Sequence, residues 1–182
     1  HFPDSSLIVV GHSLGGRVLI SLIEQFPELS CTIKKVIIVD ASAHSYEGFP
    51  FITKSMEFLE KLAKVDFSKS DKEVLDYIKA ISVNEMQESM VRLNLDLKNR
   101  RFMYNLDVII KEYLKLAYYG SKSISWEGDV YVLKALKAHY ILEHSKEHFR
   151  QNFKGLKKIV DVDCYHNIHL EKPYEIIKLL HV

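Results

Sequence analysis

The sequence predicts an α/β fold built on a parallel sheet of about four strands, with flanking helices and a helical insertion. Three observations predict it. Short apolar runs recur along the chain and are separated by helical segments with short connections. The stretch between the second and third runs, 41–126, has helical spacing and no strand pattern. The 182 residues, 47% of them hydrophobic, suffice for a single domain, 1–182, with a buried core.

The composition argues against several classes of protein. A net charge of +1 argues against a nucleic-acid partner. The two cysteines, Cys31 and Cys164, are far apart and make no disulfide framework. We therefore expect a reducing compartment, either the cytoplasm or an organelle such as the mitochondrion. No apolar run approaches the roughly 20 residues of a transmembrane helix.

The first predicted strand, Leu7–Val10, runs into a Gly-x-Ser-x-Gly turn centred on Ser13. The segment that follows, Arg17–Ile23, is predicted to be a helix that continues to about Gln25. A strand, a sharp turn carrying serine and a helix make a nucleophile elbow, which exposes the serine hydroxyl. Ser13 is therefore the candidate nucleophile.

The neighbours of Ser13 fit this geometry. Side chains at Gly11 or Gly15 are expected to collide with the adjacent strand or helix, which would explain both glycines. The backbone N–H of Leu14 is expected to point to the position of an oxyanion.

The second predicted strand runs from Lys34 or Lys35 to Val39 and ends at Asp40. A strand, a helix and a second strand with short connections predict a right-handed crossover and parallel pairing. Asp40 then lies at the carboxyl end of a strand, where the functional groups of such sheets gather.

The insertion, at about 49–125, is predicted to contain four helices because its apolar residues recur three or four positions apart. Asp71 is the expected N-cap of the second helix. The helices form either a core of their own or a lid over Ser13 that lines an acyl pocket. The four ranges are Met56–Lys64, Lys72–Val83, Asn84–Leu93 and Asn105–Tyr119.

The rest of the chain returns to alternating strands and helices. A proline favours the first turn of a helix, so Pro173 marks the start of the last one. The predicted elements are the strand Asp129–Leu136, a helix from Ile141 or Leu142 to Phe153, the strand Lys157–Val162 and the helix Tyr174–His181.

A serine nucleophile requires a base, and the sequence offers nine histidines. His12 flanks Ser13 and is expected to point away from it. His166 follows the last strand. Catalytic triads differ in the order of their members along the chain, and in one type the serine comes early and the histidine late, as here. Five other histidines are expected at the surface; they are His44, His139, His144, His148 and His181.

Two motifs resemble the α/β-hydrolase superfamily. The run Gly11–Gly16 (Gly-His-Ser-Leu-Gly-Gly) resembles the elbow of its esterases. The run His166–Pro173 resembles its terminal pattern, in which the first histidine is the base and the second, His169, packs nearby. Further segments resemble a small esterase subgroup: Val39–Ser42, and, from its lid, Arg101–Phe102 followed by Asn105–Asp107.

The resemblance leaves the acid of the triad open. Most of the superfamily carries it after the strand Asp129–Leu136, but the loop there has no carboxylate and shows His139 instead. The esterase subgroup has an aspartate at the place of Asp40, which is the first choice. Asp107, in the lid motif, is the second, and Glu143 is the third.

The superfamily has four strands before the elbow, and this sequence shows no counterpart of them or of the loop that supplies a second oxyanion donor. The resemblance implies that the chain corresponds to the C-terminal portion of the fold. Leu7–Val10 would then be an open apolar edge, through which we expect self-association.

Two functions from different classes follow. The first is a serine hydrolase that cleaves a small-molecule ester or thioester through an acyl-enzyme, with no metal or organic cofactor. Its triad would be Ser13, His166 and Asp40, with the Leu14 N–H in the oxyanion hole. The alternative is a catalytically weak or inactive fragment that acts as a binding module.

Overall fold

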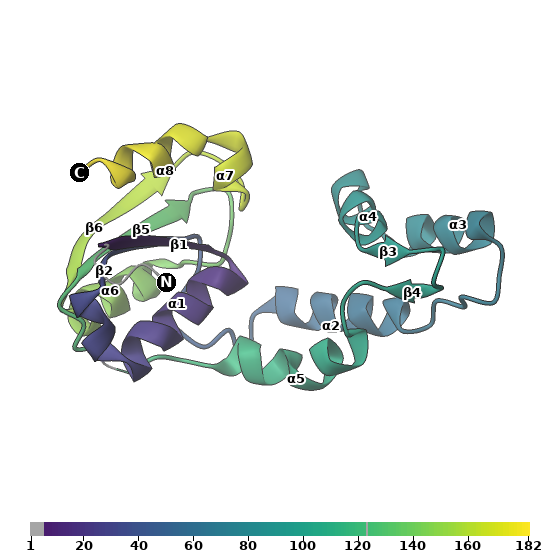
Figure 1. Ribbon diagram of the computed structural model, residues 1–182, viewed down its shortest axis with the longest axis horizontal. Helices are drawn as coiled ribbons and strands as arrows, with labels where there is room; N and C mark the ends of the chain where they lie inside the picture. Colours follow the sequence, from purple (N-terminus) through teal and green to yellow (C-terminus); the bar gives the residue numbers. More distant parts are fainter. Residues whose placement is uncertain (1–5, 123) are drawn as a thin grey trace. The chain divides into compact units, whose positions relative to one another are not determined.

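The computed structural model describes residues 6–122 and 124–182. The chain divides into two compact units, which are drawn in Figure 1. His1–Ser45 and Gly120–Val182 form the sheet unit, and Tyr46–Tyr119 form the helical unit. No helix in the described part of the chain is both long and apolar enough to cross a membrane.

The sheet unit contains four parallel strands in the order β1-β2-β5-β6 (Figure 1). This confirms the predicted α/β fold and its sheet. Each strand lies within two residues of its predicted bounds. The strands are β1 Leu7–His12, β2 Ile33–Val39, β5 Asp129–Ala135 and β6 Leu156–Val162.

Helices cover both faces of this sheet. The connections from β1 to β2 and from β5 to β6 advance across the sheet in the same direction, so right-handed crossovers place their helices on one face. Figure 1 shows α1 and α6 on that face, and α7 and α8 on the other. The helices are α1 Leu14–Gln25, α6 Glu143–Asn152, α7 Ile168–Glu171 and α8 Pro173–Leu180, and a 3₁₀ helix, η1, spans Pro27–Cys31.

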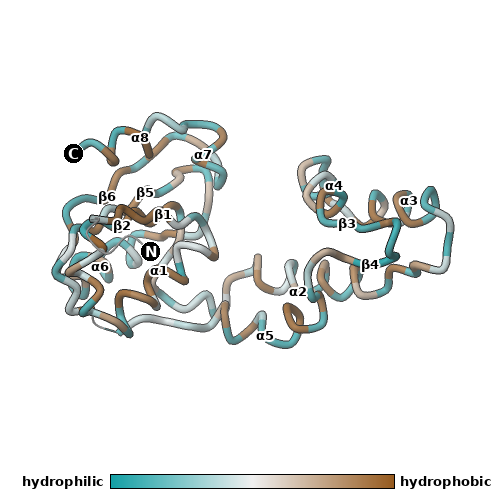
Figure 2. Tube along the Cα trace, in the orientation of Figure 1, coloured by the Kyte–Doolittle hydropathy of each residue, from teal (hydrophilic) through white to brown (hydrophobic). Residues whose placement is uncertain are grey.

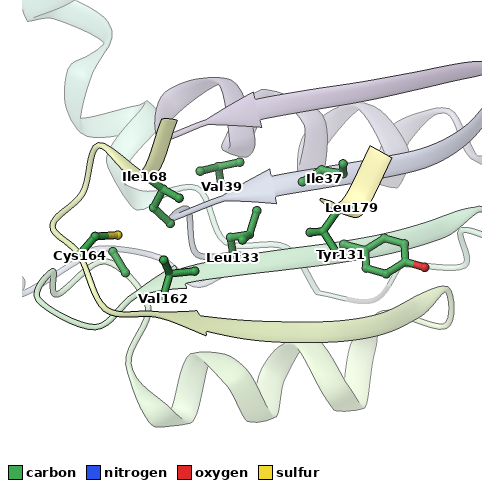
Figure 3. Close-up of a cluster of buried hydrophobic side chains, with 9 residues drawn as sticks. Ile37, Val39, Tyr131, Leu133, Val162, Cys164, Ile168 and Leu179 are labelled. Carbon is green, nitrogen blue, oxygen red and sulfur yellow. The ribbon is translucent and has the colours of Figure 1, made fainter. Parts of the chain in front are cut away.

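The core on the α7 and α8 face is an apolar cluster shown in Figure 3. Ile37 and Leu133, from the two central strands, are fully buried there, and Leu179 of α8 packs over the same face. Val36 and Ile38, on the other face of β2, are also fully buried. Burial on both faces explains why β2 reads as a continuous apolar run.

One cation is buried beside this cluster. The Lys35 ammonium group donates hydrogen bonds to the carbonyl oxygens of Leu179 (2.8 Å) and Val182 (2.5 Å), at the end of α8. It also lies 5.5 Å from the ring centroid of Tyr131. A positive charge interacts favourably with the carbonyl groups at a helix C-terminus, so Lys35 stabilises the packing of α8 against β2.

The helical unit has a core of its own, in which Leu62, Val74, Ile78, Val91 and Leu106 are buried. All four predicted helices are present, although the first begins six residues earlier than predicted. The helices are α2 Pro50–Leu62, α3 Asp71–Ile81, α4 Glu85–Arg92 and α5 Leu106–Tyr118.

Two local predictions in this unit were wrong. Ser70, and not Asp71, is the N-cap of α3, because the Ser70 hydroxyl accepts from the Glu73 N–H while the Glu73 carboxylate accepts from the Ser70 N–H. The unit also contains a short antiparallel pair, β3 Leu95–Asp96 and β4 Arg101–Phe102. Two residues per strand are too few to give a periodic signal.

The chain segments that lead into and out of the helical unit run side by side. The Tyr46 N–H donates to the Ala117 carbonyl (2.9 Å), and the Ser121 N–H donates to the Ala43 carbonyl (2.8 Å). A Cβ added at Gly120 would lie 3.2 Å from the Ser45 nitrogen, so a glycine suits this close approach. The insertion therefore begins and ends at neighbouring points.

Helix α1 anchors both of these segments to the sheet unit. The Arg17 guanidinium donates to the carbonyl oxygens of Ser42 and His44, both at 2.9 Å. The Glu24 carboxylate accepts from the Ser121 hydroxyl (3.2 Å) and the Lys122 N–H (3.1 Å). Side chains from two turns of one helix thus hold the base of the insertion.

Strand β1 is one of the two outer strands of the described sheet, and its residues are hydrophobic in Figure 2. Ile8 and Val10 are 43% and 45% exposed, and no lysine or proline within the strand discourages pairing. We expect the 182-residue polypeptide, expressed alone, to associate through this edge. Size-exclusion chromatography with light scattering should show species larger than a monomer.

A charge on the edge tests that expectation, because an edge lysine opposes strand pairing. Ile8→Lys should shift the polypeptide toward the monomer, whereas Val83→Lys, at an exposed apolar position of the helical unit, should not. A monodisperse wild-type monomer at every concentration would contradict the prediction.

Candidate active site

The candidate residues stand at one end of the sheet. Ser13 follows β1, Asp40 follows β2, and His166 lies in the loop after β6. Because the strands are parallel, all three positions lie at carboxyl ends. His166 must still reach across the sheet, since β6 and β1 are its two outer strands. Figure 3 shows how the chain does so: Ile168, at the start of α7, lies beside Val39 at the end of β2.

The structure brings these three side chains into one hydrogen-bonded chain. The Ser13 Oγ lies 2.9 Å from His166 Nε2. His166 Nδ1 lies 2.7 Å from the Asp40 Oδ2. A carboxylate only accepts, so Nδ1 carries the ring proton and Nε2 presents a lone pair to the serine hydroxyl. This is the tautomer in which an imidazole can act as a general base.

Asp40 is fixed more firmly than the other two residues. Its side chain is fully buried, and its second oxygen, Oδ1, accepts the Ala135 N–H at 3.0 Å. Its backbone has φ 47°, a left-handed conformation that aspartate tolerates better than most residues, and its N–H donates to the Leu133 carbonyl. A buried carboxylate with both oxygens bonded holds the imidazole in one orientation.

The turn that carries Ser13 is strained, as is expected of a nucleophile elbow. Ser13 has φ 54° and ψ −118°, and its N–H donates to the Val39 carbonyl at 2.9 Å. A Cβ at Gly11 would lie 2.5 Å from the Gly15 carbonyl oxygen, so Gly11 permits the close approach of strand and helix.

The prediction that a side chain at Gly15 would collide with its neighbours was wrong. Gly16, and not Gly15, is the second glycine whose position leaves no room for a side chain. A Cβ at Gly15 would meet no atom within 4 Å. A Cβ at Gly16 would lie 2.6 Å from the Ala41 Cβ and 3.3 Å from the Ile38 side chain. The contact surface of a helix repeats every three to four residues, and Gly16 is the position of this turn that faces the sheet.

Leu14 is the first residue of α1, so its N–H has no acceptor within the helix. The positive end of the helix dipole lies at the same place. Leu14 itself is 53% exposed to solvent. These features suit a backbone donor to an oxyanion beside Ser13.

The two other candidate acids have different surroundings. The Glu143 carboxylate is 79% exposed and pairs with Lys146 at 3.2 Å. Asp107 lies in the first turn of α5, in the helical unit. Among the three candidates, Asp40 is the one with a hydrogen bond to His166 in the described part of the chain.

Two rings whose contact with His166 was not predicted lie against its imidazole. Tyr140, in the loop after β5, stacks on the imidazole with a centroid distance of 4.0 Å and an interplanar angle of 28°. His12, the last residue of β1, lies 4.6 Å from the same ring and also contacts His169 at 4.5 Å. Burial lowers the pKa of His12, and the neighbouring imidazoles lower it further.

His44 and His148 were expected at the surface, but both are half-buried. Their rings lie 4.3 Å apart, and burial lowers the pKa of each. No group of three or more histidine, cysteine or acidic side chains within 6–122 and 124–182 is arranged to hold a metal ion.

Comparison with solved structures defines the class of fold. A marine microorganism esterase superimposes with a TM-score of 0.83 at 20% identity, over 97% of this chain and 69% of its own. An α/β-hydrolase enzyme from a Medee basin deep-sea metagenome library gives 0.64 at 14% identity, over 99% and 65%. The chain therefore has the fold of the α/β-hydrolase superfamily, as its two motifs imply.

Among curated proteins, the chain is similar to a putative esterase/lipase of Haemophilus influenzae. The two are 24% identical over 188 residues, which cover 99% of this chain and 61% of that protein. The chain thus spans about three fifths of the length of that relative. No family model matches the sequence.

Proposed function

We propose that this protein is a serine hydrolase that cleaves carboxylic esters or thioesters. The observation that carries the proposal is the hydrogen-bonded chain from the Ser13 hydroxyl through His166 to the buried Asp40. The esterase names of the relatives agree with it. The chemistry needs a nucleophile, a base and an orienting acid, and these three side chains offer one of each.

The acylation step would begin at Ser13. Its oxygen attacks the substrate carbonyl, and the hydroxyl proton passes to His166 Nε2, which lies 2.9 Å away. The imidazolium that forms is stabilised by Asp40 across a 2.7 Å contact. The Leu14 N–H would stabilise the oxyanion, and the proton then passes to the leaving alcohol or thiol.

The deacylation step uses the same groups in reverse. His166 takes a proton from a water molecule, whose oxygen attacks the acyl-enzyme carbonyl and releases the acid. The proton returns to the Ser13 oxygen. No step requires a metal ion or an organic cofactor.

A fluorophosphonate probe and p-nitrophenyl esters of increasing acyl length test the proposal together. The probe should label the protein at Ser13, and turnover should favour one acyl length. The conservative control is Ser21→Ala, in α1 but outside the candidate site. A protein that neither reacts with the probe nor hydrolyses any ester would refute the proposal.

A binding module is the second candidate. The observation that favours it is the exposed apolar surface of β1 and α1, where Leu14 and Val18 are 53% and 57% exposed. The same probe separates the two functions, because a binding module needs no activated serine.

A further inference from the structure

The last residue of the elbow strand makes a second connection to the base loop. His12 Nε2 lies 2.9 Å from the backbone carbonyl oxygen of His166, 154 residues later in the sequence. The same carbonyl accepts the Ile168 N–H at 3.0 Å. Both acceptor positions of this carbonyl are therefore occupied, one by the His12 ring and one by the Ile168 N–H.

The donor in this contact is defined. A carbonyl oxygen only accepts, so His12 Nε2 carries a proton. The lowered pKa of His12 means that the ring is neutral at neutral pH, with Nε2–H as its one donor. A neutral ring also puts no positive charge beside His166, which must itself become positive when it takes the serine proton.

The position of His12 links this contact to the candidate nucleophile. His12 and Ser13 are adjacent in the chain, and both of their side chains contact His166. The His12 side chain bonds to the backbone carbonyl of His166, and the Ser13 hydroxyl bonds to its imidazole. The distance between nucleophile and base is thereby fixed through the backbone as well as through the reacting atoms.

We propose that His12 is a positioning residue, whose Nε2–H holds the base loop so that the His166 imidazole stays within hydrogen-bond reach of Ser13. This proposal rests on the proposed function of Ser13 and His166. His12 touches neither the serine oxygen nor a substrate in this role and acts only through His166. A misplacement of about 1 Å is enough to lower a rate by orders of magnitude.

Two variants separate the donor from the ring. His12→Phe keeps an aromatic ring against His166 and His169 but has no N–H. His12→Gln loses the ring but keeps an amide N–H at about the distance of Nε2. A hydrogen bond of this kind corresponds to a rate factor of about ten when it is lost.

The readout is the second-order rate of labelling by a fluorophosphonate. In that reaction the Ser13 oxygen bonds to phosphorus, the P–F bond breaks, fluoride leaves and the serine proton passes to His166. We expect His12→Phe to label about tenfold more slowly than wild type and His12→Gln to stay within about threefold. With an ester substrate, kcat should fall in His12→Phe while KM stays unchanged.

His169→Ala is the matched control, because it removes a ring packed on His12 without touching the His166 carbonyl, and it should label like wild type. Thermal melting checks the fold of each variant. Should His12→Phe fail to fold, His12→Met provides a second side chain without an N–H.

The outcomes are distinguishable. Wild-type labelling in His12→Phe, or an equal loss in His12→Phe and His12→Gln, overturns the positioning role while leaving the proposed function intact. Absence of labelling in the wild-type protein overturns the proposed function itself.

Discussion

Ser13→Ala is expected to reduce ester hydrolysis to background, because Ser13 is the proposed nucleophile and loss of the serine from a catalytic triad costs roughly 10⁶-fold in kcat. The change removes the oxygen that would attack the carbonyl and keeps the Cβ, so the turn is expected to retain its backbone conformation. His166→Ala should cost nearly as much, because the serine then has no base. Steady-state kinetics with a p-nitrophenyl ester measures both.

The double variant and a neighbouring histidine provide the controls. Ser13→Ala with His166→Ala should be no slower than either single variant, since members of a triad act as a unit. His169→Ala should keep most of the activity, because no described hydrogen bond links its ring to Ser13 or Asp40. Equal losses at His166 and His169 would contradict the assignment of the base.

Asp40→Asn is expected to lower kcat by roughly 10⁴-fold while the protein stays folded. The carbonyl oxygen of the new side-chain amide would keep the bond from the Ala135 N–H, which now reaches Asp40 Oδ1. The amide NH₂ would then face His166 Nδ1 and donate to it. Nε2 would have to carry the ring proton, and it could not accept the proton of Ser13.

The backbone at this position makes the substitution a clean test. Asp40 has φ 47°, and asparagine is among the residues that tolerate this region. We therefore expect a melting temperature close to that of the wild type. Asp107→Asn and Glu143→Gln are the matched controls and should retain activity. Wild-type kcat in Asp40→Asn with loss in Asp107→Asn would move the acid to the helical unit.

The sheet and the candidate residues were predictable because both depend on short-range patterns. The apolar run that became β2 is buried on both faces, and such a run is visible in any sequence. Ser13 was identified by a turn that only certain residues permit, and His166 by its place after the last strand. These three signals are local.

The features that were not predicted depend on where loops cross. Tyr140 and His12 meet at His166 because the loop after β6 returns across the sheet, and no spacing in the sequence encodes that path. Gly15 and Gly16 are adjacent glycines, and only the rotation of α1 on the sheet decides which one must be small. Half-buried His44 and His148 were missed for a similar reason, since their contact joins a loop to a helix.

The entry and exit of the helical unit, joined by backbone bonds at Tyr46 and Ser121, have a consequence for how such a sequence can change over generations. Bringing the ends of a loop together costs free energy that grows only with the logarithm of its length, and here the two ends are already neighbours. The anchors Arg17 and Glu24 belong to α1, outside the insertion. We therefore expect that changes in the length or sequence of 46–119 leave the register of the sheet unchanged.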